Sequence, residues 1–350
     1  MKTNVVVIFG GKSSEHEVSC LSANTVVNGL NPEKYEVRKV FISKEGLWRY
    51  YEGSIAEMDA EKVVAQAPEA AIFPGQEKSS LMVCRESGWE ALPMDIVIPV
   101  MHGKNGEDGT IQGLLEIARV PYVGCGVLGS AASMDKLTTK RMVMPLGIRQ
   151  AAYEAVFGWE LKQMEAVLDR VEAAIPYPVY VKPANAGSSI GVSKAHDRAE
   201  LEAALRLAAE HDVRILVEET IIGREIECAV LGNEEPKASG VGEILAADTF
   251  YTYDAKYNNA ESKTVVDPDL PAETVEEIRR DACLIFQAVN GRGLSRVDFF
   301  VEKGTGEVVF NEINTFPGFT SISMYPMLWK NQGYTIETLV DELIELGFNR

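Results

Sequence analysis

The chain has 350 residues, of which 46% are hydrophobic and 25% are charged, an ordinary composition for a globular protein with room for two or three domains. Its formal net charge of -18 argues against nucleic acid or an anionic membrane as a partner, because phosphate surfaces attract basic proteins. A locally clustered set of basic residues could still bind a polyphosphate.

The first part of the chain alternates strand-like and helix-like segments. Runs of Val and Ile predict buried strands, and Ser14 with Glu17 has the spacing of a capping box that opens a helix. We expect strands at residues 4–9, 35–42, 95–100 and 120–123, and helices at 14–30 and 109–118. This alternation favours an α/β domain over residues 1–124, with a parallel sheet and helices on both faces. Segment 52–87 has no clear pattern and is left unplaced.

The rest of the chain divides by pattern into two further units. Residues 125–222 predict a small α+β unit, with a helix that contains Met134-Asp135-Lys136, strands at 155–157, 179–182, 190–194 and 215–218, and helices at 160–174 and 200–210. Residues 223–350 predict a C-terminal unit with strands at 225–231, 295–301 and 308–313, and helices at 272–290 and 336–346.

The five cysteines are scattered and have no metal-ligand spacing, which predicts reduced and mostly buried thiols. The apolar run Val5–Phe9 is too short for the core of a signal peptide. No stretch approaches the length of a membrane span. We therefore expect a cytoplasmic protein with no membrane partner.

A pair of strands near the C-terminus carries metal-binding residue types. Residues two apart on a strand face the same side, so Glu312 and Asn314 share a face, and hairpin register places Asp298 nearly opposite Glu312. Three hard oxygen ligands on one face suit Mg²⁺ beside the phosphates of a nucleotide. The alternative is an ordinary solvated hairpin face.

A loop after Lys182 is a candidate phosphate cradle. It holds Gly187, Ser188 and Ser189, whose backbone N–H and hydroxyl groups can approach an anion. The loop lacks the Gly-Lys-Ser/Thr end of a Walker motif, and a tight hairpin turn is the competing interpretation. Lys136 is a second candidate phosphate ligand, although a lysine on a helix usually lies on a face exposed to solvent.

Other segments carry weaker signals for a ligand. Glu15 lies at the start of the first helix, where it is either a plain cap residue or a carboxylate that grips an amino group. The glycine-rich run 102–109 follows a strand end, where open α/β sheets bind ligands. Segment 216–225 leaves a strand and could present backbone groups to an adenine and Glu225 to a ribose. The aromatic segment 251–257 predicts a closing loop, and 316–324 directly follows the metal strand.

The order of these motifs resembles that of the D-alanine–D-alanine ligase family, which belongs to the ATP-grasp enzymes, from residue 5 to the last helix. The resemblance is carried by Gly10-Gly11, Glu15 and Ser19, then His102-Gly103 to Gly109, Met134-Asp135-Lys136, Val181-Lys182-Pro183 with Gly187 to Gly191, Tyr251 to Tyr257, Ser295-Arg296-x-Asp298, and Asn311-Glu312-x-Asn314 to Gly318. It implies an ATP-grasp fold preceded by a Rossmann-like parallel-sheet domain.

The resemblance also implies a nucleotide site with two Mg²⁺ ions, for which Mn²⁺ can substitute. The expected phosphate ligands are Lys136, Lys182 and Ser188. Segment 218–221, which includes Glu218, Glu219 and Ile221, would lie near the adenine, and Glu225 near the ribose. The expected metal ligands are Asp298, Glu312 and Asn314.

For the amino-acid substrates, the resemblance implies that Glu15 holds the ammonium of the first D-alanine, with His102 close by. Arg296 and the backbone of Gly318 would face the transferring phosphate and the oxyanion. Ser323 and Met324 would meet the carboxylate of the second D-alanine. The closing loop would contribute Lys256 and Tyr257, and Ser188 with Tyr257 would orient Glu15.

The implied reaction joins two D-alanine molecules for peptidoglycan precursors, through an acylphosphate, with ADP and phosphate as the other products. Lysines and Arg296 are the residue types that stabilise the developing charge, and exclusion of water would protect the acylphosphate. The resemblance also implies a homodimer. Many family members have Lys where Glu219 stands, which is neutral if only its backbone meets the adenine.

Two alternatives stay open at this point. A D-serine or D-lactate ligase would differ in the second substrate, and Met324 leaves D-serine open, whereas Lys256-Tyr257 resembles the dipeptide-forming type. A regulator that binds nucleotide without catalysis would be expected to lack one of Arg296, Asp298, Glu312 or Asn314, and all four are present.

Overall fold

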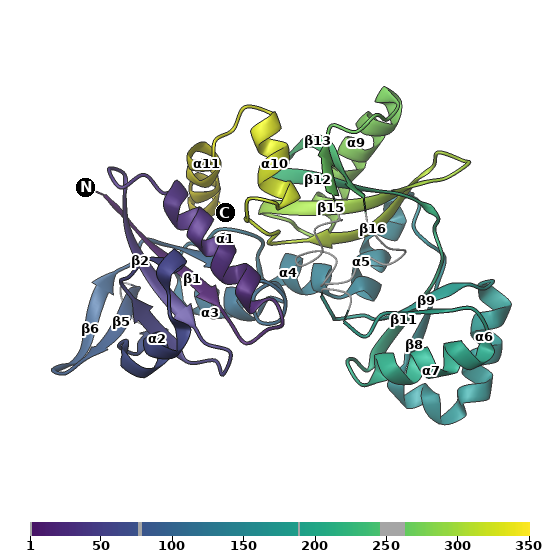
Figure 1. Cartoon of the computed structure of the whole chain (residues 1–350), viewed down its shortest axis with the longest axis horizontal. Helices are drawn as coiled ribbons and strands as arrows, with labels where there is room; N and C mark the ends of the chain where they lie inside the picture. Colours follow the sequence, from purple (N-terminus) through teal and green to yellow (C-terminus); the bar gives the residue numbers. More distant parts are fainter. Residues whose placement is uncertain (1, 76–78, 188–189, 246–262) are drawn as a thin grey trace.

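The computed structural model describes residues 2–75, 79–187, 190–245 and 263–350, and the elements form four sheets in three spatial groups (Figure 1). The N-terminal sheet has the order β3-β2-β1-β7. Its strands are β1 (Thr3–Gly10), β2 (Tyr35–Ile42), β3 (Trp48–Tyr51) and β7 (Ile96–Val100). Strand β1 pairs in parallel with β2 and β7, whereas β3 is an antiparallel edge strand.

Alternate residues of β1 enter two different cores, as the two-residue period of a strand requires. Val5, Val7 and Phe9 pack with α1 (His16–Gly29) and α11 (Ile336–Phe348). Val6 and Ile8 pack on the other face with α3 (Thr110–Ala118), and also with strands of a second sheet. The expectation of helices on both faces is therefore confirmed, although strands of the second sheet share one face with α3.

That second sheet accounts for segment 52–87, which the sequence pattern left unplaced. The segment and its continuation form η1 (Ile55–Glu57), α2 (Ala60–Gln66), β4 (Ala70–Ile72), β5 (Ser80–Arg85) and β6 (Gly88–Pro93). Strands β4, β5 and β6 make an antiparallel meander. Strand β6 is largely exposed and β4 is very short, so neither has the alternation by which strands are recognised. The strand expected at 120–123 is only an isolated bridge between Val97 and Tyr122.

The central group is built on an antiparallel sheet of order β10-β9-β11-β8. The strands are β8 (Tyr153–Phe157), β9 (Val179–Pro183), β10 (Ser193–Ala195) and β11 (Arg214–Glu219), and the helices beside them are η3 (Gly158–Gln163), α6 (Met164–Ala174) and α7 (Arg198–Ala209). Before them in the chain come α4 (Val127–Met134), α5 (Lys136–Val143) and η2 (Met144–Leu146), and α4 lies against the C-terminal group (Figure 1). Helices α6 and α7 bury one face of the sheet. On the other face, Leu137 of α5 packs against Ala184 and Leu216.

The helix expected to run through Met134-Asp135-Lys136 is two helices that meet at Asp135. The Asp135 carboxylate accepts a hydrogen bond from the Thr138 backbone N–H at 2.7 Å, which caps α5, and pairs with Arg214 at 2.5 Å. An Asp cap is a start signal for a helix. Lys136 is therefore the first residue of α5 rather than a mid-helix residue.

The C-terminal group contains a five-stranded antiparallel sheet of order β14-β13-β12-β15-β16. Its strands are β12 (Gly223–Gly232), β13 (Lys237–Leu245), β14 (Lys263–Val266), β15 (Gly293–Glu302) and β16 (Val308–Asn314), and its helices are α9 (Ala272–Ala288) and α10 (Met324–Asn331). Helix α9 packs on one face of this sheet and α10 on the other. The sequence pattern missed β13, β14 and α10.

The last helix joins the C-terminal group to the N-terminal sheet. Asp341 on α11 pairs with Lys34 at 2.5 Å and accepts a hydrogen bond from the Tyr35 hydroxyl at 2.8 Å. The limits 1–124, 125–222 and 223–350 stay a prediction. Among the described residues, no helix combines the length and apolarity needed to cross a membrane.

Candidate active site

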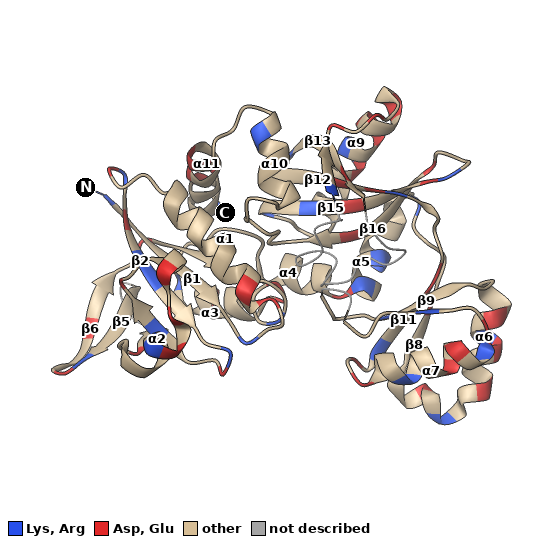
Figure 2. Ribbon diagram, in the orientation of Figure 1, with Lys and Arg blue, Asp and Glu red and all other residues tan. Residues whose placement is uncertain are grey.

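A cavity of about 640 Å³ lies where the three groups meet, within the size range of small-molecule sites. Most of the predicted site residues line it: Glu15, Lys136, Lys182, Glu218, Glu219, Ile221, Glu225, Arg296, Asp298, Glu312 and Asn314. Figure 2 shows basic and acidic residues interspersed over the ribbons of all three groups of the described chain. The positive groups near this cavity are therefore a local feature of an acidic protein.

Three predicted residues, Ser188, Lys256 and Tyr257, lie outside the described residues. Four others, His102, Gly318, Ser323 and Met324, are not among the residues that line the cavity.

The predicted metal ligands come together where the middle of β15 pairs with the last residues of β16. Asp298 lies directly opposite Glu312, as the hairpin register predicted, and the Asn314 amide donates to Asp298 Oδ2 at 3.1 Å. The register shifts between Asp298 and Phe299, so the ladder is irregular beside the cavity, where bulges often redirect side chains. The two carboxylates and one amide form a hard-oxygen donor set.

Protein cations neutralise these carboxylates. Lys136 Nζ lies 3.3 Å from Glu312 Oε2, and Arg296 Nη2 lies 2.6 Å from Asp298 Oδ2. No group of three or more His, Cys, Asp and Glu side chains in the described part of the chain is arranged to hold a metal. A divalent ion here would use the amide of Asn314 and oxygens of ligand or water, which fits Mg²⁺.

Arg296 is buried between two carboxylates. Its Nη2 also lies 3.1 Å from Glu227 Oε1, and Glu227 on β12 pairs directly with Asp298 on β15. Burial by itself lowers the pKa of the Arg296 guanidinium, but the charges of Asp298 and Glu227 raise it well above its usual value. The sequence analysis missed Glu227, because its place next to Asp298 follows only from the pairing of β12 with β15.

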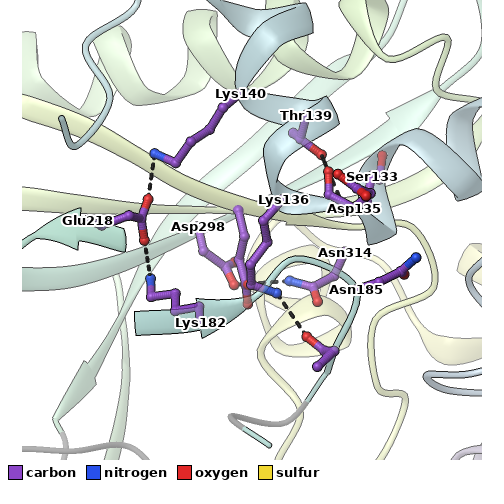
Figure 3. A network of polar contacts seen from close by, with 12 residues as sticks. Ser133, Asp135, Lys136, Thr139, Lys140, Lys182, Asn185, Glu218, Asp298 and Asn314 are labelled. Atoms are coloured by element: carbon purple, nitrogen blue, oxygen red, sulfur yellow. Dashed lines mark hydrogen bonds and ion pairs between the residues drawn. The ribbon is translucent and has the colours of Figure 1, made fainter. Parts of the chain in front are cut away.

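A second charge cluster contains Lys182 and Glu218. The Glu218 carboxylate lies 2.6 Å from Lys182 Nζ and 2.6 Å from Lys140 Nζ, and the two lysines reach it from opposite sides (Figure 3). Burial would raise the pKa of the Glu218 carboxyl, but attraction to Lys182 and Lys140 lowers it to about 2. Lys140 was missed by the sequence analysis. Its position four residues after Lys136 on one helix was the available signal.

The carboxylate of Glu219 has a structural use. Glu219 Oε1 accepts a hydrogen bond from the Ala152 backbone N–H at 2.8 Å. A bound ligand would therefore meet mainly the backbone at this position. The departure from the Lys of many relatives is compatible with nucleotide binding on this geometry.

Glu15 is the cavity-lining residue that the N-terminal group supplies at the start of α1. It is the N-cap residue of α1, but its side chain makes no capping hydrogen bond. The predicted capping box is wrong, since Ser13 Oγ accepts from the Glu15 N–H at 3.0 Å and Glu17 pairs with Lys44. The Glu15 carboxylate lies close to Gly103 and Gly187, where an added Cβ would meet Oε2 at 2.4 Å and 3.3 Å.

Glu107, within the predicted run 102–109, also lines the cavity. Its carboxylate accepts from the Gly103 N–H at 2.6 Å and from the Phe316 N–H at 3.2 Å. Burial and the neighbouring Glu15 raise the pKa of Glu107 to about 8. Glu107 thus fastens the loop after β7 to the loop after β16.

His102 makes a second link between the same loops. Its Nδ1 lies 2.9 Å from the Phe316 carbonyl oxygen and its Nε2 lies 3.0 Å from Ser22 Oγ, and the ring is buried. Both ring nitrogens contact protein groups. His102 therefore positions the walls of the cavity.

The segment after β16 folds back on itself. Ser323 Oγ accepts from the Thr320 N–H at 3.0 Å, and a Cβ at Gly318 would lie 2.7 Å from that oxygen. Met324 begins α10, and its side chain is 3% exposed in the core against Gly242. The role of Met324 at the second substrate stays a prediction, since Met324 is not among the residues that line the cavity.

Comparison with known proteins agrees with the resemblance in the sequence. Residues 4–125 match the family model described as D-ala D-ala ligase N-terminus, and residues 142–345 match D-ala D-ala ligase C-terminus. The D-alanine–D-alanine ligase of Ruminiclostridium cellulolyticum is 49% identical, and that of Acetivibrio thermocellus 47%, over the whole chain and 96% of each relative.

Two solved structures have the same architecture. The VanG D-Ala:D-Ser ligase of Enterococcus faecalis superposes with a TM-score of 0.89 at 36% identity, covering 99% of this chain and 100% of that one. The D-alanine-D-alanine ligase of Coxiella burnetii gives 0.86 at 35% identity, covering 100% of this chain and 94% of that one.

Proposed function

Since the chain belongs to the D-alanine–D-alanine ligase family, we propose that it joins two D-alanine molecules in an ATP-dependent reaction that supplies peptidoglycan precursors. The products are D-alanyl-D-alanine, ADP and phosphate. The observation that carries the proposal is the convergence, in one cavity, of two lysines and Arg296 with the carboxylates of Asp298, Glu312 and Glu15.

The nucleotide binds between the central and C-terminal groups. Lys136 and Lys182 supply the positive charge for the phosphates, and small-residue backbone near Gly187 can approach them. The backbone of 219–221 faces the adenine, and Glu225 accepts from the ribose hydroxyls. All of these residues line the cavity, which supports the assignment.

Asp298, Glu312 and Asn314 would hold Mg²⁺ in the nucleotide complex. When bound, such ions neutralise phosphate charge in the transition state. In the structure, Arg296 and Lys136 already contact the two carboxylates. These cations therefore lie within reach of the same phosphates that the metal site would serve.

The first D-alanine lies on the Glu15 side of the cavity. Glu15 accepts hydrogen bonds from the substrate ammonium, and its place in the lining of the cavity supports this assignment. His102 and Glu107 position the surrounding loops through Phe316. Ser188 and Tyr257 orient Glu15, Lys256 contributes from the closing loop, and Ser323 with the Met324 backbone meets the second D-alanine.

The reaction then proceeds in two steps. A carboxylate oxygen of the first D-alanine attacks the γ-phosphorus of ATP, and ADP leaves. The amine of the second D-alanine attacks the resulting acylphosphate carbon, the tetrahedral intermediate loses phosphate, and the amine gives up a proton. Arg296 and the Gly318 N–H stabilise the charge on the phosphoryl group and the oxyanion.

The test is phosphate release by the purified protein with Mg-ATP, with the product identified by mass. We expect release with D-alanine alone and the mass of the dipeptide, and no release with L-alanine. Release that requires added D-serine or D-lactate would change the second substrate. ATP binding without release under any of these conditions would contradict a ligase.

We further propose a cytoplasmic homodimer. All five cysteines are free, which suits a reducing compartment. Leu21 of α1 and Ile117 of α3 in the N-terminal group are 59% and 66% exposed, as residues of an interface would be in a single chain. Sedimentation equilibrium at micromolar concentration distinguishes a dimer from a monomer.

A further inference from the structure

We propose that Lys140 is a positioning residue for the nucleotide: it holds the Glu218 carboxylate in place while Lys182 turns to the phosphates. This inference rests on the proposed nucleotide site. Lys140 itself would not touch the nucleotide, because it lies behind the cavity wall. Its side chain is 2% exposed, whereas that of Lys182 is 18% exposed and lines the cavity.

The surroundings of Lys140 fix its ammonium group. Nζ lies 2.6 Å from Glu218 Oε1 and 3.4 Å from the Ala151 carbonyl oxygen. It also lies 5.3 Å from the centroid of the Tyr153 ring, a cation–π distance. A buried lysine with these three partners has little freedom to move.

Lys182 differs because it has two possible partners. In the structure it pairs with Glu218 Oε2 at 2.6 Å (Figure 3). Glu312, a proposed metal ligand, also acts on its charge, which shows that Lys182 lies near the expected phosphate site. A polyphosphate in the cavity therefore competes with Glu218 for the Lys182 ammonium.

The charge count explains the need for a second lysine. Two lysines share one carboxylate, so the cluster has an excess positive charge directed at the cavity. If Lys182 moves toward a phosphate, Glu218 keeps Lys140 as its counter-ion. Without Lys140, the buried Glu218 carboxylate would either take up a proton or keep Lys182 paired to it and away from the phosphates. The reason is that an unpaired buried charge is costly.

Glu218 also leads directly into the segment that lines the nucleotide side of the cavity. Loss of its counter-ion would therefore affect that wall as well as Lys182. Both effects weaken nucleotide binding. Neither acts on Glu15, at the amino-acid side.

The test compares MgADP affinity, by titration calorimetry, among full-length variants. Lys140→Met keeps most of the volume and removes the charge, and we expect it to raise the Kd by about tenfold, as for loss of an electrostatic partner. Lys140→Arg should restore most of the affinity. Arg141→Met, on the exposed side of the same helix, is the matched control and should match the wild type.

A double mutant separates positioning from general stability. In a Glu218→Gln background, Lys140→Met should have little further effect on the Kd, because the carboxylate it serves is gone. In turnover assays, the KM for ATP should rise in Lys140→Met while the KM for D-alanine stays within twofold. Lys140→Gln replaces Lys140→Met if circular dichroism shows the latter to be unfolded.

Equal MgADP affinity of wild type and the uncharged variant, or an undiminished effect in the Glu218→Gln background, would overturn the proposal. The proposed function is judged separately, by D-alanine-dependent phosphate release of the wild type. If Lys140→Met weakens MgADP binding as expected but the wild type releases no phosphate with D-alanine, Lys140 keeps its positioning role and the ligase assignment is wrong. A wild type that does not bind MgADP would overturn both.

Discussion

Arg296 grips Asp298 with two parallel hydrogen bonds, from Nε to Oδ1 at 2.7 Å and from Nη2 to Oδ2 at 2.6 Å. The two residues are separated by one position on β15, so their side chains share a face of the sheet. This fork geometry orients the carboxylate and places a permanent cation beside the proposed metal ligands. Strand β15 thus supplies both a cation, Arg296, and a proposed metal ligand, Asp298, to the same site.

Asp298→Asn should lower D-alanine-dependent phosphate release by about 100-fold or more, because one charged metal ligand is lost and Arg296 loses its bidentate partner. The check is a Mg²⁺ titration of kcat. Asp169→Asn, at a carboxylate that is 73% exposed on α6, is the matched control and should leave kcat unchanged. A variant at position 298 that keeps more than about one tenth of the wild-type kcat would contradict the role of Asp298.

Gly103→Ala should impair the amino-acid side of the cavity. Gly103 has φ +68, and an added Cβ would lie 2.4 Å from Glu15 Oε2, so the methyl group would displace that carboxylate. We expect the KM for the first D-alanine to rise by about tenfold. Gly304→Ala has a similar backbone cost, with φ +96, but no atom within 4 Å of the new Cβ. Equal KM values for the two variants would show that strain, rather than contact with Glu15, is responsible.

Glu15→Gln should raise the KM for the first D-alanine by about 100-fold, because a neutral amide replaces the charged partner of the ammonium. The KM for ATP should stay near that of the wild type, since Glu15 binds the amino acid rather than the nucleotide in the proposed complex. Glu17→Gln removes a charge from an exposed residue of the same helix and is the control. Initial rates at fixed ATP and varied D-alanine measure the difference.

The Glu218 carboxyl should make stability depend on pH in the acid range. Its pKa is about 2 in the folded protein and near 4.5 in the unfolded chain, so its stabilising contribution is complete above about pH 4.5 and is lost as the pH falls toward 2. At about pH 4 we expect a loss of about 1 kcal/mol from this group. The difference between the urea unfolding midpoints of the wild type and of Glu218→Gln should be smaller at about pH 4 than at about pH 6. A constant gap would contradict the low pKa.

Three cysteines should react slowly with iodoacetamide in the folded protein. Burial raises the pKa of the Cys20 thiol to about 12, that of Cys125 to about 11 and that of Cys228 to about 12, so the reactive thiolate is scarce near neutral pH. Peptide mass spectrometry at about pH 8 should find these sites unmodified in the native protein and alkylated after denaturation. Rapid labelling of Cys125 in the native protein would contradict its burial.

The local patterns of the sequence determined strands β1, β2 and β7 of the N-terminal sheet, the long helices and the hairpin of β15 and β16, but missed the edge strand β3. The facing of Asp298 and Glu312 followed from a two-residue period and a short turn, both of which are properties of neighbouring residues. The order of the motifs also identified the family. Element limits were approximate, as at the two helices that meet at Asp135, where a capping side chain interrupts one apolar pattern.

The tertiary structure alone decided which distant residues meet. Lys140 and Glu227 have no motif of their own. Lys140 meets Glu218 because α5 packs on β11, and Glu227 meets Arg296 because β12 pairs with β15. Glu107 gains its second hydrogen bond from Phe316, across two groups of the fold. Strands within segment 52–87 pack on β1 and bury its apolar face, and this contact between distant parts of the chain is not visible in the local pattern. Local spacing sets which way a side chain points, whereas burial and charge pairing depend on packing between elements, and packing is a property of the whole chain.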